Sequence, residues 1–131
     1  MNNYSIKEIS DRYNMPHSTL HYYEEIGLLE NVGRSESGRR IYNDCHICRL
    51  DAIICFKNTG MSISDINKFF TYEKDLEAHI DEITHLMEEH DKNIKNQIQL
   101  LLTEQEHIQR KVRYYKGIKK AIENNMQWPS Y

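Results

Sequence analysis

The sequence is poor in the features that mark several common classes of protein. It has three cysteines, an odd number, so we expect no framework of disulfide bonds and a chain that stays reduced. No apolar run approaches the roughly 18 residues that a membrane-spanning helix needs. The N-terminus lacks the charged lead and apolar segment of a signal peptide. We therefore predict a cytoplasmic protein with no membrane partner.

An excess of positive charge is also missing. The 131 residues include 17 lysines and arginines against 20 aspartates and glutamates, which gives a net charge of −3. Many nucleic-acid-binding proteins are basic overall, so any contact with DNA would require a local basic patch. The sequence also lacks a paired nucleophile and base, a glycine-rich phosphate loop and a metal motif. We therefore expect no enzyme, no cofactor and no metal site.

The N-terminal residues predict two short helices joined by a tight turn. Ser5 and Glu8 have the spacing of a capping box, and the apolar residues that follow share one helical face, so we expect a helix over residues 6–13. Asn14 should end it. The second helix should end at Gly27, because glycine readily takes the left-handed conformation that ends helices. Two short helices in this arrangement predict a helix-turn-helix.

The second of these helices is predicted to carry a polar outer face. Leu20 and Leu28 can face inward, and Tyr23 is assigned either to the core or to a partner. The side chains expected on the outer face are those of His17, Ser18, His21 and Tyr22. Adjacent aromatic and polar side chains of this kind favour a surface that meets a polar partner over a core.

Residues 30–42 predict a two-stranded hairpin, or wing. Turn-forming residues at 35–38, with the glycine late in the loop, separate two extended segments. Arg34, Arg39 and Arg40 form the densest cationic cluster in the N-terminal half. On a chain of net negative charge, this cluster is the predicted basic patch.

Three further helices are predicted after the wing. The first spans residues 44–58, and the second starts at a Ser-x-x-Asp motif at Ser62 and runs through Phe70. The third is a single long helix. The fold class is therefore mainly α: a winged helix-turn-helix head over residues 1–72, a coiled-coil dimerisation helix over residues 73–122, and a short tail over residues 123–131.

The long helix carries an apolar stripe, called the seam below. Its spacings alternate between four and three, apart from two consecutive fours around Ile94, which predicts a coiled coil with one stutter. The seam positions are Leu76, Ile80, Ile83, Met87, His90, Ile94, Ile98, Leu101, Gln105, Ile108, Val112, Tyr115, Lys119 and Ile122. A helix of roughly 43 residues would be about 65 Å long and could not bury this stripe against a small head. We therefore expect a homodimer; a hairpin folded back around residues 93–97 is the alternative, although no turn residues stand there.

Four segments resemble the MerR family of bacterial transcription regulators. They are residues 4–9, 18–29, 34–42 and 60–66, and they include the adjacent tyrosines Tyr22 and Tyr23. The resemblance implies a winged helix-turn-helix head and an antiparallel coiled-coil homodimer. It also implies binding to palindromic, double-stranded promoter DNA whose −35 and −10 elements are too far apart, and distortion of that spacer so that RNA polymerase is affected indirectly.

That account predicts the residues that contact DNA. They are His17, Ser18, His21, Tyr22, Tyr23, Arg34, Arg39, Arg40 and Tyr42. The family commonly has arginine where this chain has His21. A neutral histidine lacks the fixed charge of arginine, so we expect DNA binding to strengthen as the pH falls through the histidine range.

The cysteines raise the question of a sensed signal. Cys45 and Cys48 lie one helical turn apart and could share a soft ion, but no second pair completes a tetrahedral site, so packing is the favoured interpretation. Cys55 resembles the sensor cysteine of a MerR branch that responds to aldehydes, other electrophiles or nitrosative stress. Asp51, one turn earlier, would disfavour a thiolate there, so a packing role for Cys55 remains an alternative.

Two other functions stay open. One is a DNA-binding repressor that needs no effector, and the other is a coiled-coil adaptor whose head binds protein. Residues 123–131 are expected to be too few for a drug-binding domain.

Overall fold

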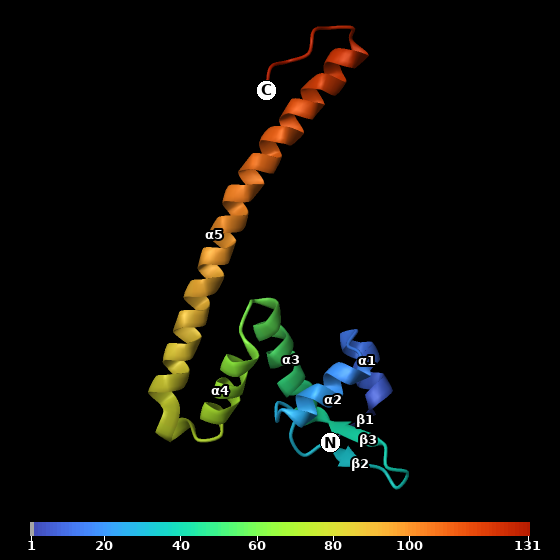
Figure 1. The fold of residues 1–131 in the computed structure, drawn as a ribbon, viewed down its shortest axis with the longest axis vertical. Helices are drawn as coiled ribbons and strands as arrows, with labels where there is room; N and C mark the ends of the chain where they lie inside the picture. Colours follow the sequence, from blue (N-terminus) through green and yellow to red (C-terminus); the bar gives the residue numbers. More distant parts are fainter. Residues whose placement is uncertain (1) are drawn as a thin grey trace. The chain divides into compact units, whose positions relative to one another are not determined.

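The computed structural model describes residues 2–131, which divide into two units, one ending at Glu88 and the other comprising Glu89–Tyr131. The elements follow in the order β1 (Asn3–Ser5), α1 (Ile6–Tyr13), α2 (His17–Glu25), β2 (Gly33–Arg34), β3 (Arg40–Asn43), α3 (Asp44–Asn58), α4 (Ile63–Glu73) and α5 (Leu76–Glu123) (Figure 1). The predicted fold class, a winged helix-turn-helix head followed by a long helix, is confirmed. No helix within residues 2–131 combines the length and the apolarity needed to cross a membrane.

The wing is a three-stranded antiparallel sheet in the order β1-β3-β2. The structure contains the predicted hairpin, formed by β2 and β3, and it pairs Arg34 with Arg40. The strand β1 was not predicted; it pairs Tyr4 with Tyr42 on the other side of β3. Three residues are too few to show the alternation that identifies a strand, so only the fold reveals β1.

Side-chain caps fix where the helices of the head begin. The Ser5 hydroxyl accepts a hydrogen bond from the Glu8 amide at 3.1 Å, and the Ser5 amide donates to the Glu8 carboxylate at 3.1 Å, which completes the expected capping box. Asn43 caps α3 in the same way. Ser62 caps α4 through the Asp65 amide at 3.1 Å, and this helix continues beyond the predicted end at Phe70.

One hydrophobic core holds the head together. Its buried residues are Ile9, Leu20, Tyr23, Leu28, Leu29, Tyr42, Ile47, Leu50, Ile53, Met61, Ile66 and Phe70. Met87 of α5 packs against this cluster, and Ile83 is buried as well. The first unit therefore extends into α5 as far as Glu88, beyond the boundary at residue 72 that the change of sequence pattern suggested.

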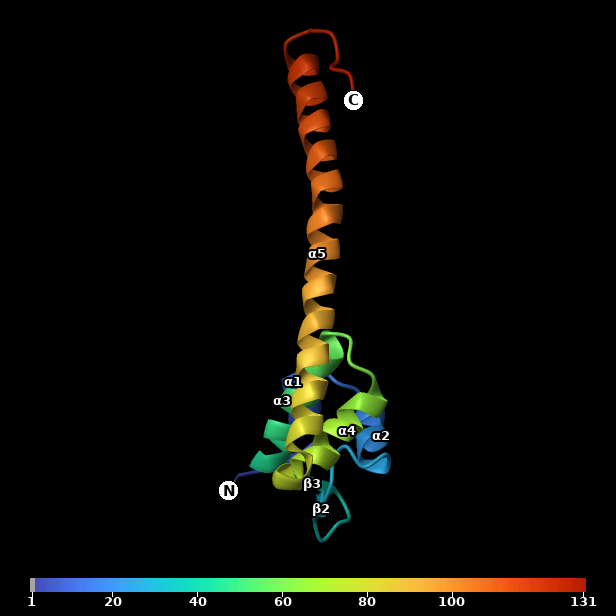
Figure 2. The ribbon, with the colours of Figure 1, turned by 90° about the vertical axis from the view of Figure 1, so that its left-hand side faces the viewer.

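The second unit consists of most of α5 and the tail. Its helix is continuous through residues 93–97, so the folded-back hairpin does not occur. After Glu123 the chain turns at Asn125, which has a φ of 54°, and runs back beside the helix (Figure 2). The Tyr131 ring then lies 5.0 Å from the Tyr114 ring, centroid to centroid. Pro129 lies over Gly117, where an added Cβ would be 3.1 Å from the Pro129 Cγ.

Candidate nucleic-acid interface

The outer face of α2 has the polar character that the sequence predicted. His17, Ser18 and His21 are exposed, and Tyr22 retains 46% of its exposure. Pro16 stands at the N-cap of this helix and makes no side-chain hydrogen bond there. The first backbone N–H groups of α2 are thus left without a side-chain cap, which suits an anionic partner.

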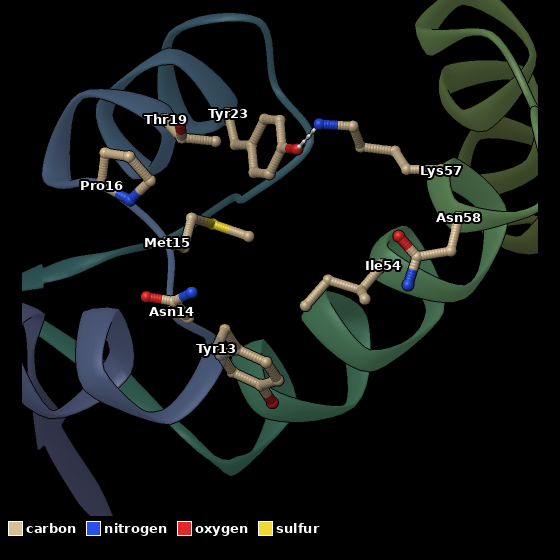
Figure 3. Close-up of a pocket in the computed structure, with 9 residues that line it drawn as sticks. All are labelled: Tyr13, Asn14, Met15, Pro16, Thr19, Tyr23, Ile54, Lys57 and Asn58. Carbon is tan, nitrogen blue, oxygen red and sulfur yellow. Dashed lines mark hydrogen bonds between the residues drawn. The ribbon is translucent and has the colours of Figure 1, made fainter.

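Tyr23 belongs to the core. Its side chain is 1% exposed, and its hydroxyl accepts a hydrogen bond from Lys57 Nζ at 2.8 Å (Figure 3). This bond ties α2 to α3 across a shallow cavity of about 320 Å³. Of the two assignments that the sequence left open for Tyr23, the structure favours packing with a satisfied hydroxyl.

Tyr42 is also buried, which corrects its predicted placement on the DNA-binding surface. It lies on the central strand β3 with no exposed surface, and its ring meets the His46 ring edge-on at 5.7 Å. Its hydroxyl finds no hydrogen-bond partner among residues 2–131. Burial raises the pKa of Tyr42 above its ordinary value. A side chain enclosed by the sheet and helices cannot reach a phosphate in this conformation.

A network centred on Glu24 joins the wing to α2. The Arg34 guanidinium donates to Glu24 Oε1 at 2.7 Å, and Arg40 Nε donates to Oε2 at 2.6 Å. Partial burial alone would raise the pKa of Glu24, but the hydrogen bonds from Arg40 and Arg34 lower it below its ordinary value. The sequence reasoning did not identify Glu24, because positions 24, 34 and 40 meet only in the folded chain.

The same network includes His21. Its Nε2 lies 2.9 Å from Arg40 Nη1. Since arginine can only donate, His21 Nε2 is the acceptor in this contact. The structure thus brings together His21, Arg34 and Arg40, three of the residues proposed from the sequence as DNA contacts.

Arg39 differs from the other two wing arginines. It is exposed, and its side chain makes no ion pair or hydrogen bond within the described part of the chain. The turn before it is closed by a hydrogen bond from the Ser35 amide to the Arg39 carbonyl at 2.8 Å, with Gly38 at a φ of 82°. Arg39 is therefore held at the tip of the wing with its guanidinium available to a partner.

All three cysteines are exposed, which is not what simple packing residues would show. Near Cys55, the Asp51 carboxylate accepts a hydrogen bond from the Tyr13 hydroxyl at 2.8 Å. Burial and this bond raise the pKa of Tyr13 to about 12. Within residues 2–131, no group of three or more histidine, cysteine or acidic side chains could hold a metal ion.

Comparison with known proteins gives consistent matches. Residues 4–73 match the family described as "MerR HTH family regulatory protein". The chain is 34% identical over 116 residues to an uncharacterized HTH-type transcriptional regulator of Haemophilus influenzae, covering 88% of this chain and 86% of that one.

Solved structures agree with these matches. The structure of HiNmlR, described as a MerR family regulator lacking the sensor domain and bound to promoter DNA, has a TM-score of 0.82 and 33% identity over 91% of this chain and 90% of that one. A MerR family transcriptional regulator from Bacillus thuringiensis has a TM-score of 0.73 and 29% identity over 86% of this chain and 98% of that one.

Proposed function

This chain belongs to the MerR HTH family of regulatory proteins, and from that premise we propose that it acts as a homodimer on palindromic promoter DNA. It is a DNA-binding transcriptional regulator. The resemblance seen in the sequence is thereby confirmed. The prediction that the chain is not an enzyme is supported as well, because the relatives it matches are named as regulators.

The exposed seam of α5 supports the homodimer. In the second unit, Ile98, Leu101, Ile108, Val112, Tyr115 and Ile122 each keep 45% or more of their exposure. Fully burying one such aliphatic side chain contributes about 1.5–3 kcal/mol. The tail packs over Tyr114 and Gly117, on a different face of the helix from the seam, so it leaves the seam open to a second chain.

The distribution of charge along α5 favours an antiparallel pair. Residues 77–91 include Glu77, Asp81, Glu82, Glu88, Glu89 and Asp91 and no lysine or arginine. Residues 107–120 include Arg110, Lys111, Arg113, Lys116, Lys119 and Lys120 and no acidic residue. An antiparallel arrangement places the acidic segment of one chain beside the basic segment of the other, whereas a parallel arrangement places like charges together.

The network around Glu24 is the main observation that supports the proposed DNA-binding face. It sets the wing arginines beside the exposed side of α2, so one head can bind the backbone and enter a groove together. The similar HiNmlR structure is bound to promoter DNA. In this proposal His17, Ser18, His21, Tyr22, Arg34, Arg39 and Arg40 contact DNA, and the buried Tyr23 and Tyr42 support the surface from behind.

Two heads at a fixed separation would read two half-sites, which accounts for a palindrome. Distorting the spacer between promoter elements costs of order 1–6 kcal/mol, so each head needs several phosphate contacts. RNA polymerase would respond indirectly, through the altered alignment of the −35 and −10 elements, and the protein would act in the cytoplasm.

Transcription in vitro tests this proposal. The same palindrome is placed in two promoters, one with a long spacer and one with ordinary spacing. We expect stimulation only from the long spacer. Repression of both promoters would instead support the effector-independent repressor, and a chain that fails to bind the palindrome would support the adaptor.

Response to thiol-reactive stress is proposed at Cys55. Its exposure supports the access that modification requires, and the hydrogen bond from Tyr13 engages the nearby Asp51 carboxylate. Mass spectrometry after treatment with a mild aldehyde or a nitrosothiol tests this role. Cys55 should be modified before Cys45, and equal rates at the two sites would contradict the proposal.

A further inference from the structure

The N-terminal end of α3 carries two thiols, one helical turn apart, that open into one cavity. Cys45 and Cys48 are both exposed, and both line a hollow of about 290 Å³ between α3 and α4. Phe69 and Phe70 of α4 form part of its wall. The proposed DNA contacts and the proposed sensor at Cys55 make no use of this hollow.

The backbone beneath the two thiols is fixed. The Asn43 side-chain oxygen accepts hydrogen bonds from the amides of Cys45 at 2.9 Å and His46 at 3.3 Å. The His46 ring is engaged elsewhere: Nδ1 accepts from the Asn43 amide at 3.0 Å, and Nε2 donates to the Glu30 carbonyl at 2.7 Å. His46 therefore offers no third ligand, and the site is a dithiol alone.

The spacing of the pair selects what it can bind. Residues three apart on a helix have Cβ atoms about 5–6 Å apart, whereas a disulfide needs about 3.5–4.5 Å. A direct S–S bond would thus distort the capped first turn. A single atom that forms one bond to each sulfur spans the wider gap without distortion.

The wall of the hollow suits an aromatic group. Phe69 and Phe70 meet edge-on with centroids 5.2 Å apart. The Arg49 guanidinium lies 4.0 Å from the centre of the Phe70 ring and donates to the Leu28 carbonyl, so it is a fixed part of the wall. A ring carried on the bridging atom would pack against these side chains.

We propose that Cys45 and Cys48 form a binding site for trivalent arsenicals that carry a small aromatic substituent. With Ar for the aromatic substituent and Cys–SH for each thiol, the reaction is Ar–As=O + 2 Cys–SH → Ar–As(S–Cys)₂ + H₂O. Two As–S bonds form, the As=O bond breaks, and both thiol protons leave with the oxygen as water. Arsenic stays trivalent, so neither an oxidant nor a reductant is needed.

Phenylarsine oxide and the full-length protein test the site. Intact mass spectrometry should show one phenylarsenic adduct per chain, and the free thiols should fall from three to one. Closing a ring on one rigid turn raises the effective concentration of the second thiol, so Cys45→Ser or Cys48→Ser should weaken retention about 10²–10⁴-fold. Cys55→Ser is the matched control and should keep the adduct.

The serine substitutions replace exposed thiols, and circular dichroism would check that each variant is folded. If the aromatic wall contributes, Phe69→Ala should weaken the binding of phenylarsine oxide more than the binding of methylarsine oxide. Retention in either Cys45→Ser or Cys48→Ser that is as tight as in the wild type, an adduct that maps to Cys55, or no adduct on the wild-type protein would overturn the proposal.

Discussion

Replacing Glu24 by glutamine tests whether the network holds the wing against α2. The substitution keeps the size of the side chain and removes the charge that Arg34 and Arg40 share. Hydrogen bonds to charged groups contribute about 1.5–3 kcal/mol each when sheltered, and exposed ion pairs about 0.2–1 kcal/mol. The Arg34 side chain is 42% exposed and that of Arg40 29%. We therefore expect the free energy of unfolding to fall by about 1–3 kcal/mol at pH 7.

Chemical denaturation at matched protein concentration measures this decrease, because dimerisation makes stability depend on concentration. Glu25→Gln is the control: it removes the same charge from the next, exposed position. The lowered pKa of Glu24 adds a second signature. Its contribution is fully present above the ordinary glutamate pKa of about 4.3 and is lost as the pH falls through the lower pKa of the folded state.

The gap in stability between wild type and Glu24→Gln should therefore close at acid pH. Equal decreases for Glu24→Gln and Glu25→Gln at pH 7 would refute the reasoning. So would a gap that persists unchanged at a pH where the Glu24 carboxyl is protonated in the folded protein.

Three further changes have defined outcomes. Arg39→Ala should weaken promoter binding, measured by fluorescence anisotropy. It should also reduce the slope of log affinity against log salt concentration by about 0.9 for each DNA phosphate that the arginine neutralises. The control Lys92→Ala removes an exposed charge from α5 and should leave this slope unchanged. His21 lies on the exposed face of α2 and contacts Arg40, so His21→Ala should weaken promoter binding in the same assay; unchanged affinity would contradict a DNA contact at this position. Gly117→Ala places a Cβ 3.1 Å from the Pro129 Cγ, so Pro129 must move by a few tenths of an ångström. The tail should then pack less closely on α5 and become more sensitive to protease; unchanged proteolysis would contradict this.

The capping motifs explain why so much of the fold could be predicted. Ser5 and Ser62 mark the starts of α1 and α4 within four residues of sequence, so local patterns suffice. Asn43 caps α3 with a histidine as its capping-box partner, which the usual motif does not include. Local chemistry thus located the helices even where the exact cap was not foreseen.

Contacts between residues that are far apart in the sequence limited what could be predicted. The sequence places Tyr42 on the surface because it adjoins an arginine cluster, yet the pairing of β1 with β3 and the packing of α3 enclose it. Glu24 could not be identified because nothing in the sequence around it points to Arg34 or Arg40. Both errors concern which side chains meet across the head, a question that sequence periodicity does not address.

Glu24 also alters how the head would respond to ionic strength. Arg34 and Arg40 together carry two positive charges, but with Glu24 between them the cluster carries only one. The carboxylate acts as an internal counterion, so fewer cations leave the DNA than a count of arginines suggests. A regulator built this way would stay bound to its promoter over a wider range of cellular salt concentration. Shape complementarity and groove contacts would then supply a larger share of the binding free energy.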